Sequence, residues 1–518
     1  MVPNADLTPY KIYLQYKSLV HGAVVGMFTF YLIFRVAWIC DDALINVRTA
    51  LNMYVGSGPV YNVGKRVQGY TSPLWFWLSF AIGSIFNEFI VTSIVLSLLF
   101  ACLTFAVLGA KSLNVYRLIT VGLSIYFSSS ILDYSTGGLE NAVGMLCIVA
   151  FLISTQSNTT RSQIVLGVSA SLVFLTRFDY AILVLPLMAL FFIGPQSRKR
   201  KLYVTAITLM LPIFWFVFSK IYYGRFLPNT FYAKLNVDIP KSEMLLQGFR
   251  YILVSVELDP SLLIVFLASL ITILLTKSRL HQVAFISSIA YLVYVVWVGG
   301  DFMAGRFFTA PLVIWLWNIG TAPTALPKVF ERNFSVFMAI LFIFLCFQSM
   351  IENRPSYNSA ERNDFTLGGV ADEAGYHRSR GSSLIGLFLE SKGELAAFED
   401  APGNGRLFLV VQKQKLWFKS SVLPQGRERI VARTCGELGN EGIRSGPGVH
   451  IIDTCGLVDP FLSKIKYSSN NFEWRIGHFS RTLPDGYEDA VRYSDPSYLV
   501  DTELQQQLEK IWREVRTN

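Results

Sequence analysis

The sequence is poor in charged residues. Only 16% of its 518 residues are Asp, Glu, Lys or Arg, whereas 52% are hydrophobic and the mean hydropathy is +0.43. A soluble chain of this length has too little core to bury so much apolar surface. The composition therefore argues against a soluble enzyme and indicates a membrane protein.

The sequence also lacks the short motifs of several enzyme classes. It has no Walker phosphate-binding loop, no dinucleotide-binding glycine loop, no serine-nucleophile elbow and no Cys/His spacing typical of a metal site. Its formal net charge of +9 comes without a basic and aromatic stripe, so we attribute it to membrane topology rather than to nucleic-acid binding. These absences favour a lipid-delivered substrate over a soluble nucleotide cofactor.

Apolar runs of roughly 15 to 20 residues recur from Val24 to Met350 and then stop. Residues 1–350 are therefore predicted to form an all-α, polytopic membrane domain with about eleven transmembrane helices. The first run has no convincing cleavage site, so it is interpreted as a span rather than a signal peptide. Ser72–Phe86 is apolar but short, and it is predicted to be an interfacial or re-entrant helix. The predicted spans are 24–40, 90–109, 117–131, 141–155, 163–176, 180–194, 202–219, 261–276, 282–298, 307–320 and 334–350.

Residues 351–518 have a different composition. They are Gly-rich, charged and broken by turns, and apolar stretches such as Leu407–Val411 are no longer than a buried strand. We predict a soluble α/β domain here. If this domain is exported, Cys435 and Cys455 can form a disulfide, and two free thiols are the alternative.

Basic loops predict which way the chain crosses the membrane. Clusters such as Arg198–Lys201 and Lys277–His281 are expected on the cytoplasmic side, as is the N-terminus. The C-terminal domain is then outside. Five polar loops emerge on that same face and can share one active site: 41–72, 132–140, 177–179, 220–260 and 299–306.

Two adjacent acids, Asp41 and Asp42, follow the first span and are the candidate catalytic residues. Carboxylates at a membrane surface are costly unless they are solvated, paired or bound to a cation. One of them can act as the base that deprotonates a sugar hydroxyl, while the other orients it or holds a metal. A solvated helix end is the structural alternative.

Three cations on the same face are candidate phosphate-binding residues: Arg306, Lys234 and Arg177. A guanidinium fork or an ammonium group suits a lipid phosphate whose negative charge grows as it leaves. Asn229 and Tyr232 share the motif PNTFYAK with Lys234 and join this set. Membrane anchoring is the alternative for these cations, and a salt bridge within TRFDY is an equal alternative for Arg177.

Five further residues are predicted to contact a sugar or the acceptor. Tyr70 and Trp75 supply aromatic faces, Glu140 ends a flexible glycine turn, and Asp301 lies in the motif GGDFMAGRFF. His478 is the candidate from the C-terminal domain. A position at the lipid headgroups is the alternative for Tyr70 and Trp75, and a plain loop with an acid at a helix start is the alternative for Glu140. Turns in a folded domain explain His478 as well.

The motifs, taken in order, resemble a known family. They are DDALINVRTALNMYVGSGPVYNVGKRVQGYTSPLW (Asp41–Trp75), STGGLE, TRFDY, PNTFYAK, GGDFMAGRFF and DTCGLVDP. The chain resembles bacterial membrane arabinofuranosyltransferases of the GT-C fold, which include the mycobacterial enzymes that add terminal arabinofuranose and their pilin-modifying counterparts. The resemblance implies a polyprenyl-phosphate sugar donor and catalysis by the acidic pair Asp41 and Asp42.

The same resemblance implies an enzyme of the bacterial inner membrane that acts on a cell-wall polysaccharide or a pilin. No cofactor is required, and a divalent cation such as Mg²⁺ or Mn²⁺ is optional. An enzyme of the same build that uses a polyprenyl-phosphate hexose and modifies lipopolysaccharide, O-antigen or pilin is the main alternative. A transporter of lipid-linked sugar is disfavoured because the acids cluster at span ends on one face.

Overall fold

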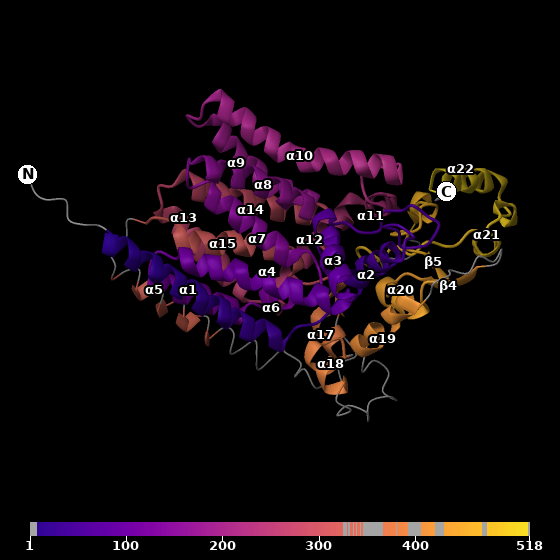
Figure 1. Cartoon of the computed structure of the whole chain (residues 1–518), viewed down its shortest axis with the longest axis horizontal. Coiled ribbons are helices and arrows are strands. Elements are labelled where there is room, and N and C mark those ends of the chain that lie inside the picture. The colour runs from indigo at the N-terminus through magenta and orange to yellow at the C-terminus, as the bar shows by residue number, and fades with distance from the viewer. Residues whose placement is uncertain are drawn as a thin grey trace, which may run out of the picture.

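The computed structural model describes residues 8–324, 366–379, 381–391, 406–419, 429–468 and 474–515, together with scattered helical residues between 329 and 344. Figure 1 shows long helices running side by side along the long axis of the molecule. The elements after residue 366 gather at the end of this bundle opposite the N-terminus. The membrane-type helices and the C-terminal region thus meet along one end of the bundle.

The bundle is built from apolar helices. They are α1 (Thr8–Arg35), α4 (Ile90–Lys111), α5 (Val115–Phe127), α7 (Asn141–Ser154), α8 (Thr160–Thr176), α9 (Ala181–Ile193), α10 (Arg198–Tyr223), α13 (Ser261–Leu275), α14 (Arg279–Trp297) and α15 (Thr309–Thr321). Helix α15 is buried on every side, as expected for a helix that is apolar all round. It packs against α7, α13 and α14 and so forms the centre of the bundle.

The first ten predicted spans each coincide with one of these helices, and the eleventh, 334–350, runs into residues outside the described ones. By length and composition, four described helices can cross a membrane, or five if the bent pair α12 (Lys241–Leu258) and α13 is one span. The other apolar helices are shorter. The chain is a multi-pass membrane protein, and the predicted number of crossings stays a prediction.

Segments expected to be loops contain helices. Residues 41–72 include α2 (Asp41–Tyr54), and residues 220–260 include α11 (Asn229–Leu235) and α12, which bends by 98° from α13. The predicted first span also ends at Arg35, before an extended segment. Charged residues interrupt the apolar pattern of α2 and α12, which is why hydropathy alone does not reveal these helices.

Two further short helices and a 3₁₀ turn connect the longer helices. Helix α3 (Pro73–Phe86) occupies the segment predicted to be interfacial or re-entrant, and Ser72 caps it by accepting a hydrogen bond from the Trp75 backbone. Proline in its first turn is favourable there because that position needs no backbone donor. Helix α6 (Ser129–Tyr134) and the 3₁₀ turn η1 (Phe178–Tyr180) complete the connections.

The C-terminal region contains helices and a few short strands. The helical elements are α17 (Glu373–Ser379), α18 (Leu384–Ser391), α19 (Arg406–Lys419), α20 (Leu438–Ser445), η4 (Leu462–Lys464), α21 (Tyr487–Tyr493), η5 (Pro496–Tyr498) and α22 (Thr502–Val515). The strands are β2 (Thr366–Leu367), β3 (Val370–Ala371), β4 (Ile430–Thr434), β5 (Val449–Asp453) and β6 (Tyr467–Ser468). Antiparallel β2–β3 and parallel β4–β5 form two-stranded sheets.

One strand of this region pairs outside it. Strand β6 is parallel to β1 (Val237–Asp238), which lies between α11 and α12. The described strands therefore form only two-stranded sheets, so the α/β character predicted for this region is weak.

The short apolar segment Leu407–Val411 is helical. Its apolar pattern continues through α19, where Leu407, Val410, Gln414 and Trp417 are buried at helical spacing.

The disulfide between Cys435 and Cys455 is formed, with 5.0 Å between the two Cα atoms. It ties the end of β4 to the end of β5, and the free-thiol alternative is excluded.

Candidate active site

The acidic pair begins helix α2. Cys40 is extended and precedes Asp41, and both carboxylates lie in the first turn, where the helix dipole favours negative charge. Neighbouring residues on an α-helix point about 100° apart, so the two side chains face different partners. The two acids consequently have different environments.

Asp41 faces the C-terminal region. Its carboxylate accepts hydrogen bonds from the backbone N–H groups of Gly439 and Asn440, at 2.9 and 2.6 Å, in the first turn of α20. Burial raises the pKa of Asp41 to about 7, although these two hydrogen bonds pull the pKa down. Because both oxygens are occupied by α20, Asp41 joins α2 to the C-terminal region.

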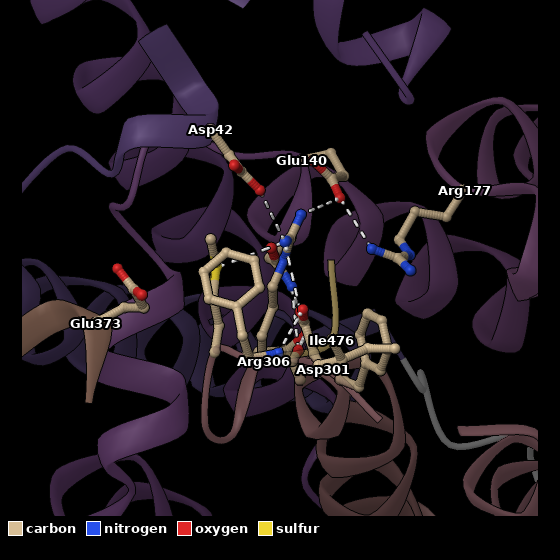
Figure 2. Close-up of polar contacts among 12 residues, drawn as sticks. Asp42, Glu140, Arg177, Asp301, Arg306, Glu373 and Ile476 are labelled. Carbon is tan, nitrogen blue, oxygen red and sulfur yellow. Dashed lines mark hydrogen bonds and ion pairs between the residues drawn. The ribbon is translucent and has the colours of Figure 1, made fainter. Parts of the chain in front are cut away.

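Asp42 faces a group of buried charges centred on Arg306. The Arg306 guanidinium lies 3.5 Å from Asp42, 3.5 Å from Asp301 and 3.2 Å from Glu140. Figure 2 shows these side chains pointing toward one another. The side chains of Arg306, Asp301 and Glu140 are 8%, 6% and 2% exposed, whereas that of Asp42 is 34% exposed. Asp42 is thus the carboxylate of this group that reaches the surface.

A tight turn positions Arg306. Arg306 begins the 3₁₀ turn η2 (Arg306–Phe308), which follows the motif GGDFMAG. Gly300 has a φ of +76°, and a Cβ atom there would lie 2.4 Å from Tyr251. Only glycine combines this backbone conformation with such a close approach, so the motif brings Asp301 and Arg306 to the same point.

Glu140 connects the group to a second arginine. It lies just before α7, and its carboxylate is 3.2 Å from both Arg306 and Arg177. Arg177 also makes a two-pronged ion pair with Asp179. The salt bridge proposed within TRFDY is therefore present, and the same arginine also belongs to the charged cluster.

These contacts shift the titration of the cluster. Burial alone would raise the pKa of Glu140, but the guanidinium groups of Arg306 and Arg177 hold it below its ordinary value. Desolvation raises the pKa of Asp42, and the positive charges of Arg306 and Lys234 only partly offset this effect. A carboxylate with a raised pKa is a stronger base, which is the property a proton acceptor needs.

Lys234 and His478 border the same carboxylate. Lys234 is exposed on α11, and its charge and that of His478 both act on Asp42. The His478 ring packs edge-on against Phe302, with 4.6 Å between ring centroids. Lys234 is not part of any ion pair in the described residues, whereas Arg306 is shared by three carboxylates.

Four other predicted residues lie outside this cluster. Asn229 is buried and donates hydrogen bonds to the carbonyl groups of Gly456 and Asp459, and Tyr232 stacks beneath the Arg225 guanidinium. Tyr70 stacks on Phe76 at 4.0 Å, and the Trp75 indole donates to the Gly138 carbonyl. Tyr70 and Trp75 are 1% and 0% exposed, so they pack the core and have no free face for a sugar.

The structure also brings in residues that the sequence motifs did not single out. Glu373 of α17 is buried and pairs with His377 at 3.1 Å and with Arg475 at 2.9 Å. Arg475 lies over the Phe302 ring, which itself contacts His478. The spacing of Glu373 and His377 by one helical turn was the signal available in the sequence.

Among the described residues, no three His, Cys, Asp or Glu side chains are grouped so that they could hold a metal ion. The carboxylates of the cluster converge on the Arg306 guanidinium instead. We therefore assign no residues to the optional divalent cation.

Comparison with known proteins identifies similar enzymes. A terminal β-(1→2)-arabinofuranosyltransferase of Mycobacterium tuberculosis is 25% identical over 520 residues, covering 86% of this chain and 81% of that protein. A second one, from Corynebacterium glutamicum, is 27% identical over 381 residues, covering 64% of this chain and 54% of that protein. No family model matches the chain.

One solved structure is also similar. ArnT from Cupriavidus metallidurans, in a crystal structure bound to undecaprenyl phosphate, aligns with a TM-score of 0.49 at 12% identity, covering 83% of this chain and 85% of that chain. The two arabinofuranosyltransferases confirm the resemblance inferred from the motifs and with it the enzyme class.

Proposed function

We propose that this membrane glycosyltransferase transfers arabinofuranose from a polyprenyl phosphate to a hydroxyl group of a cell-envelope glycan or glycoprotein. The choice of sugar rests on the two similar arabinofuranosyltransferases and on the shared motifs. The choice of a lipid donor rests on the resemblance and on the position of the charged cluster beside membrane-type helices.

One observation carries the proposal: the Asp42 carboxylate, a third exposed, stands at the edge of an otherwise buried charge cluster. The buried carboxylates of Glu140 and Asp301 also pair with Arg306 and fix the orientation of its guanidinium. Arg306 can therefore orient the Asp42 carboxylate. An oriented, accessible carboxylate with a raised pKa is the arrangement expected of a general base.

The reaction then follows from these positions. Asp42 accepts the proton of the acceptor hydroxyl. At the same time, the oxygen of that hydroxyl bonds to the anomeric carbon of the sugar. The bond from that carbon to the phosphate oxygen breaks, and polyprenyl phosphate leaves with the bonding electrons. Lys234, the exposed cation beside Asp42, stabilises the growing charge on the phosphate.

Three members of the cluster, Arg306, Glu140 and Arg177, have positioning roles in this scheme. The Arg306 guanidinium is already compensated by carboxylates, so we assign it to the orientation of Asp42 rather than to direct phosphate binding. Glu140 and Arg177 keep Arg306 in place through their shared ion pairs. We assign His478, whose charge also acts on Asp42, to contact with the acceptor.

We further propose the membrane placement predicted from the basic loops. Residues 1–350 form the membrane domain and residues 351–518 form an extracytoplasmic domain in the bacterial inner membrane, with the N-terminus in the cytoplasm. The disulfide between Cys435 and Cys455 supports export of this region, because disulfides persist in oxidising compartments.

The deciding experiment measures transfer of labelled sugar by the purified full chain from synthetic polyprenyl-phosphate arabinofuranose to a panel of glycan and pilin acceptors. The panel is repeated with the corresponding hexose donor and with an Asp42→Asn variant. We expect transfer from the arabinofuranose donor and its loss in a folded Asp42→Asn protein. Transfer from the hexose donor alone would overturn the sugar assignment, and an active Asp42→Asn variant would overturn the assignment of the base.

A further inference from the structure

A small polar cavity, partly open to solvent, lies apart from the charged cluster, where α10, α11 and α22 meet. Figure 1 shows α11, α22 and the adjoining end of α10 on the same side of the molecule. The cavity is lined by residues that include Arg66, Gln68, Tyr223, Arg225, Asn229 and Val515. Asn229 and Lys234 belong to the same short helix α11, so the cavity is about two helical turns or less from the proposed phosphate-binding lysine.

The neutral polar groups of this cavity already have partners. Gln68 donates to the Tyr70 carbonyl and accepts from Ser219, and the Tyr223 hydroxyl bonds to the Pro59 carbonyl. The Asn229 amide nitrogen donates to carbonyl groups of the loop at residues 456–459, and its oxygen accepts from Arg225 and Ser463. The two arginines are therefore the groups that can take a ligand.

Both arginines have donor capacity to spare. The Arg66 Nε atom is buried and has no hydrogen-bond partner among the described residues, and its guanidinium lies 5.9 Å from the Tyr222 ring. Arg225 gives one hydrogen bond, to the Asn229 side chain at 3.0 Å, and lies over the Tyr232 ring. A buried guanidinium nitrogen without a partner is costly unless a ligand satisfies it.

Positive charge is in excess around the cavity. Lys464 lies close to both Arg225 and Lys510, and desolvation together with these two charges lowers the pKa of Lys464. The acid that faces this group is Glu514 of α22, and it makes no ion pair with either arginine in the described residues. An anion in the cavity would relieve this repulsion.

The position of the cavity suggests the source of the anion. Helix α10 is long and apolar enough to cross a membrane, and it ends at Tyr222 and Tyr223, beside the cavity. Aromatic residues at the end of a span mark the depth of the lipid headgroups. The end of this span is therefore where headgroup phosphates are expected, near the level of the two arginines.

We propose that the pocket of Arg66 and Arg225 binds a phosphate ester, separately from the Asp42 cluster. Two guanidinium forks can hold the oxygens of one phosphate by charge-assisted hydrogen bonds. The ester belongs either to a membrane phospholipid or to a soluble phosphate compound, and both present the same group to the arginines.

A second cavity among the described residues offers no comparable surplus of charge. It is lined by residues that include Cys40, Asp41, His377, Arg406 and Asn440. Asp41 is bound by α20, His377 pairs with Glu373, and Arg406 pairs with Glu437 at 2.8 Å. Its charges are satisfied within the protein, which is why we place the ligand in the arginine pocket.

The test measures binding to the purified full chain by native mass spectrometry, with phosphatidylglycerol and glycerol 3-phosphate as separate probes. The wild type is compared with Arg66→Gln/Arg225→Gln, with Arg66→Lys/Arg225→Lys, and with Arg250→Gln, which removes an exposed arginine of α12. We expect the Gln pair to weaken binding roughly tenfold or more and the Lys pair to weaken it less, because lysine keeps the charge but not the fork.

The two probes separate the sources. Saturable binding of phosphatidylglycerol alone identifies a lipid headgroup site, and comparable binding of glycerol 3-phosphate identifies a site for soluble phosphate esters. The proposal is overturned if neither probe binds the wild type, if the Gln pair binds like the wild type, or if Arg250→Gln weakens binding as much. If the Gln pair does not fold, the Lys pair is compared with the wild type instead. In that case, binding of the probes by the Lys pair as tightly as by the wild type overturns the proposal.

This inference does not depend on the proposed transferase reaction. The Asp42→Asn variant is expected to bind both probes like the wild type, because Asp42 does not line the cavity. Loss of sugar transfer with intact phosphate binding, or the reverse, therefore shows which of the two assignments fails.

Discussion

Replacing the two neighbouring acids one at a time should separate a structural role from a catalytic one. Asp41 holds two backbone N–H groups of α20, as a helix-capping side chain does. Asp41→Ala leaves both donors without their partner, and losing such a cap costs about 0.5 to 2 kcal/mol. Burial of the unpaired donors pushes the expected loss toward the upper end of that range.

Asp42→Ala should have the opposite profile. Arg306 keeps its ion pairs with Glu140 and Asp301, so its charge stays compensated and the change in stability should be below about 1 kcal/mol. If Asp42 is the general base, its loss should reduce kcat by about 10² to 10⁴-fold. The rate loss at Asp41→Ala should be much smaller than this.

The assay pairs an apparent Tm, measured on the purified protein in one detergent, with the initial rate of sugar transfer. Asp238→Ala is the matched control, because Asp238 is exposed and pairs only with the exposed Lys466. It should change neither quantity. A fully stable but inactive Asp41→Ala protein together with an active Asp42→Ala protein would refute the division of roles.

Three further outcomes follow from the geometry. Because the pKa of Asp42 is raised above its ordinary value of 3.8 and a base acts when deprotonated, kcat/KM should fall with falling pH at a pH higher than for an ordinary carboxyl group; a rate independent of pH from 4 upward would contradict this. Glu140→Gln leaves two buried guanidinium groups undercompensated and should lower stability by about 3 kcal/mol, seen as a lower apparent Tm, whereas an unchanged Tm would show that the cluster is not coupled. Replacing Cys435 and Cys455 by Ser should cost about 3 kcal/mol for a loop of this length, and a reducing agent should lower the Tm of the wild type but not of the variant.

Much of the membrane part could be predicted from hydropathy, and the reason is physical. A bilayer demands long apolar helices, so the first ten predicted spans coincide with helices such as α4 and α14. Helices α2 and α12 were missed because they rest on the bundle and on the C-terminal region rather than in lipid. Their buried faces carry polar residues such as Arg48, which donates to the Gly446 and Val449 carbonyl groups.

The candidate site was predictable in part. Motif order brought Asp42, Glu140 and Arg306 into one set, and the structure places their side chains in contact. The aromatic residues Tyr70 and Trp75 were misjudged because sequence does not tell a buried ring from one that faces a ligand. The difference between Asp41 and Asp42 was invisible for the same reason, since it depends on α20, nearly four hundred residues away in the chain.

That separation bears on the biogenesis of the enzyme. The partners of Asp41 lie 398 and 399 residues further along the chain, and those of Arg48 lie about as far. Contacts across such distances form only after most of the chain has been synthesised. The contacts of α2 with the C-terminal region therefore form last, after the bundle helices have been inserted. In a nascent chain, the helix that carries the proposed base would rest on the bundle alone, and it would gain its second support only when the final segment has folded against it.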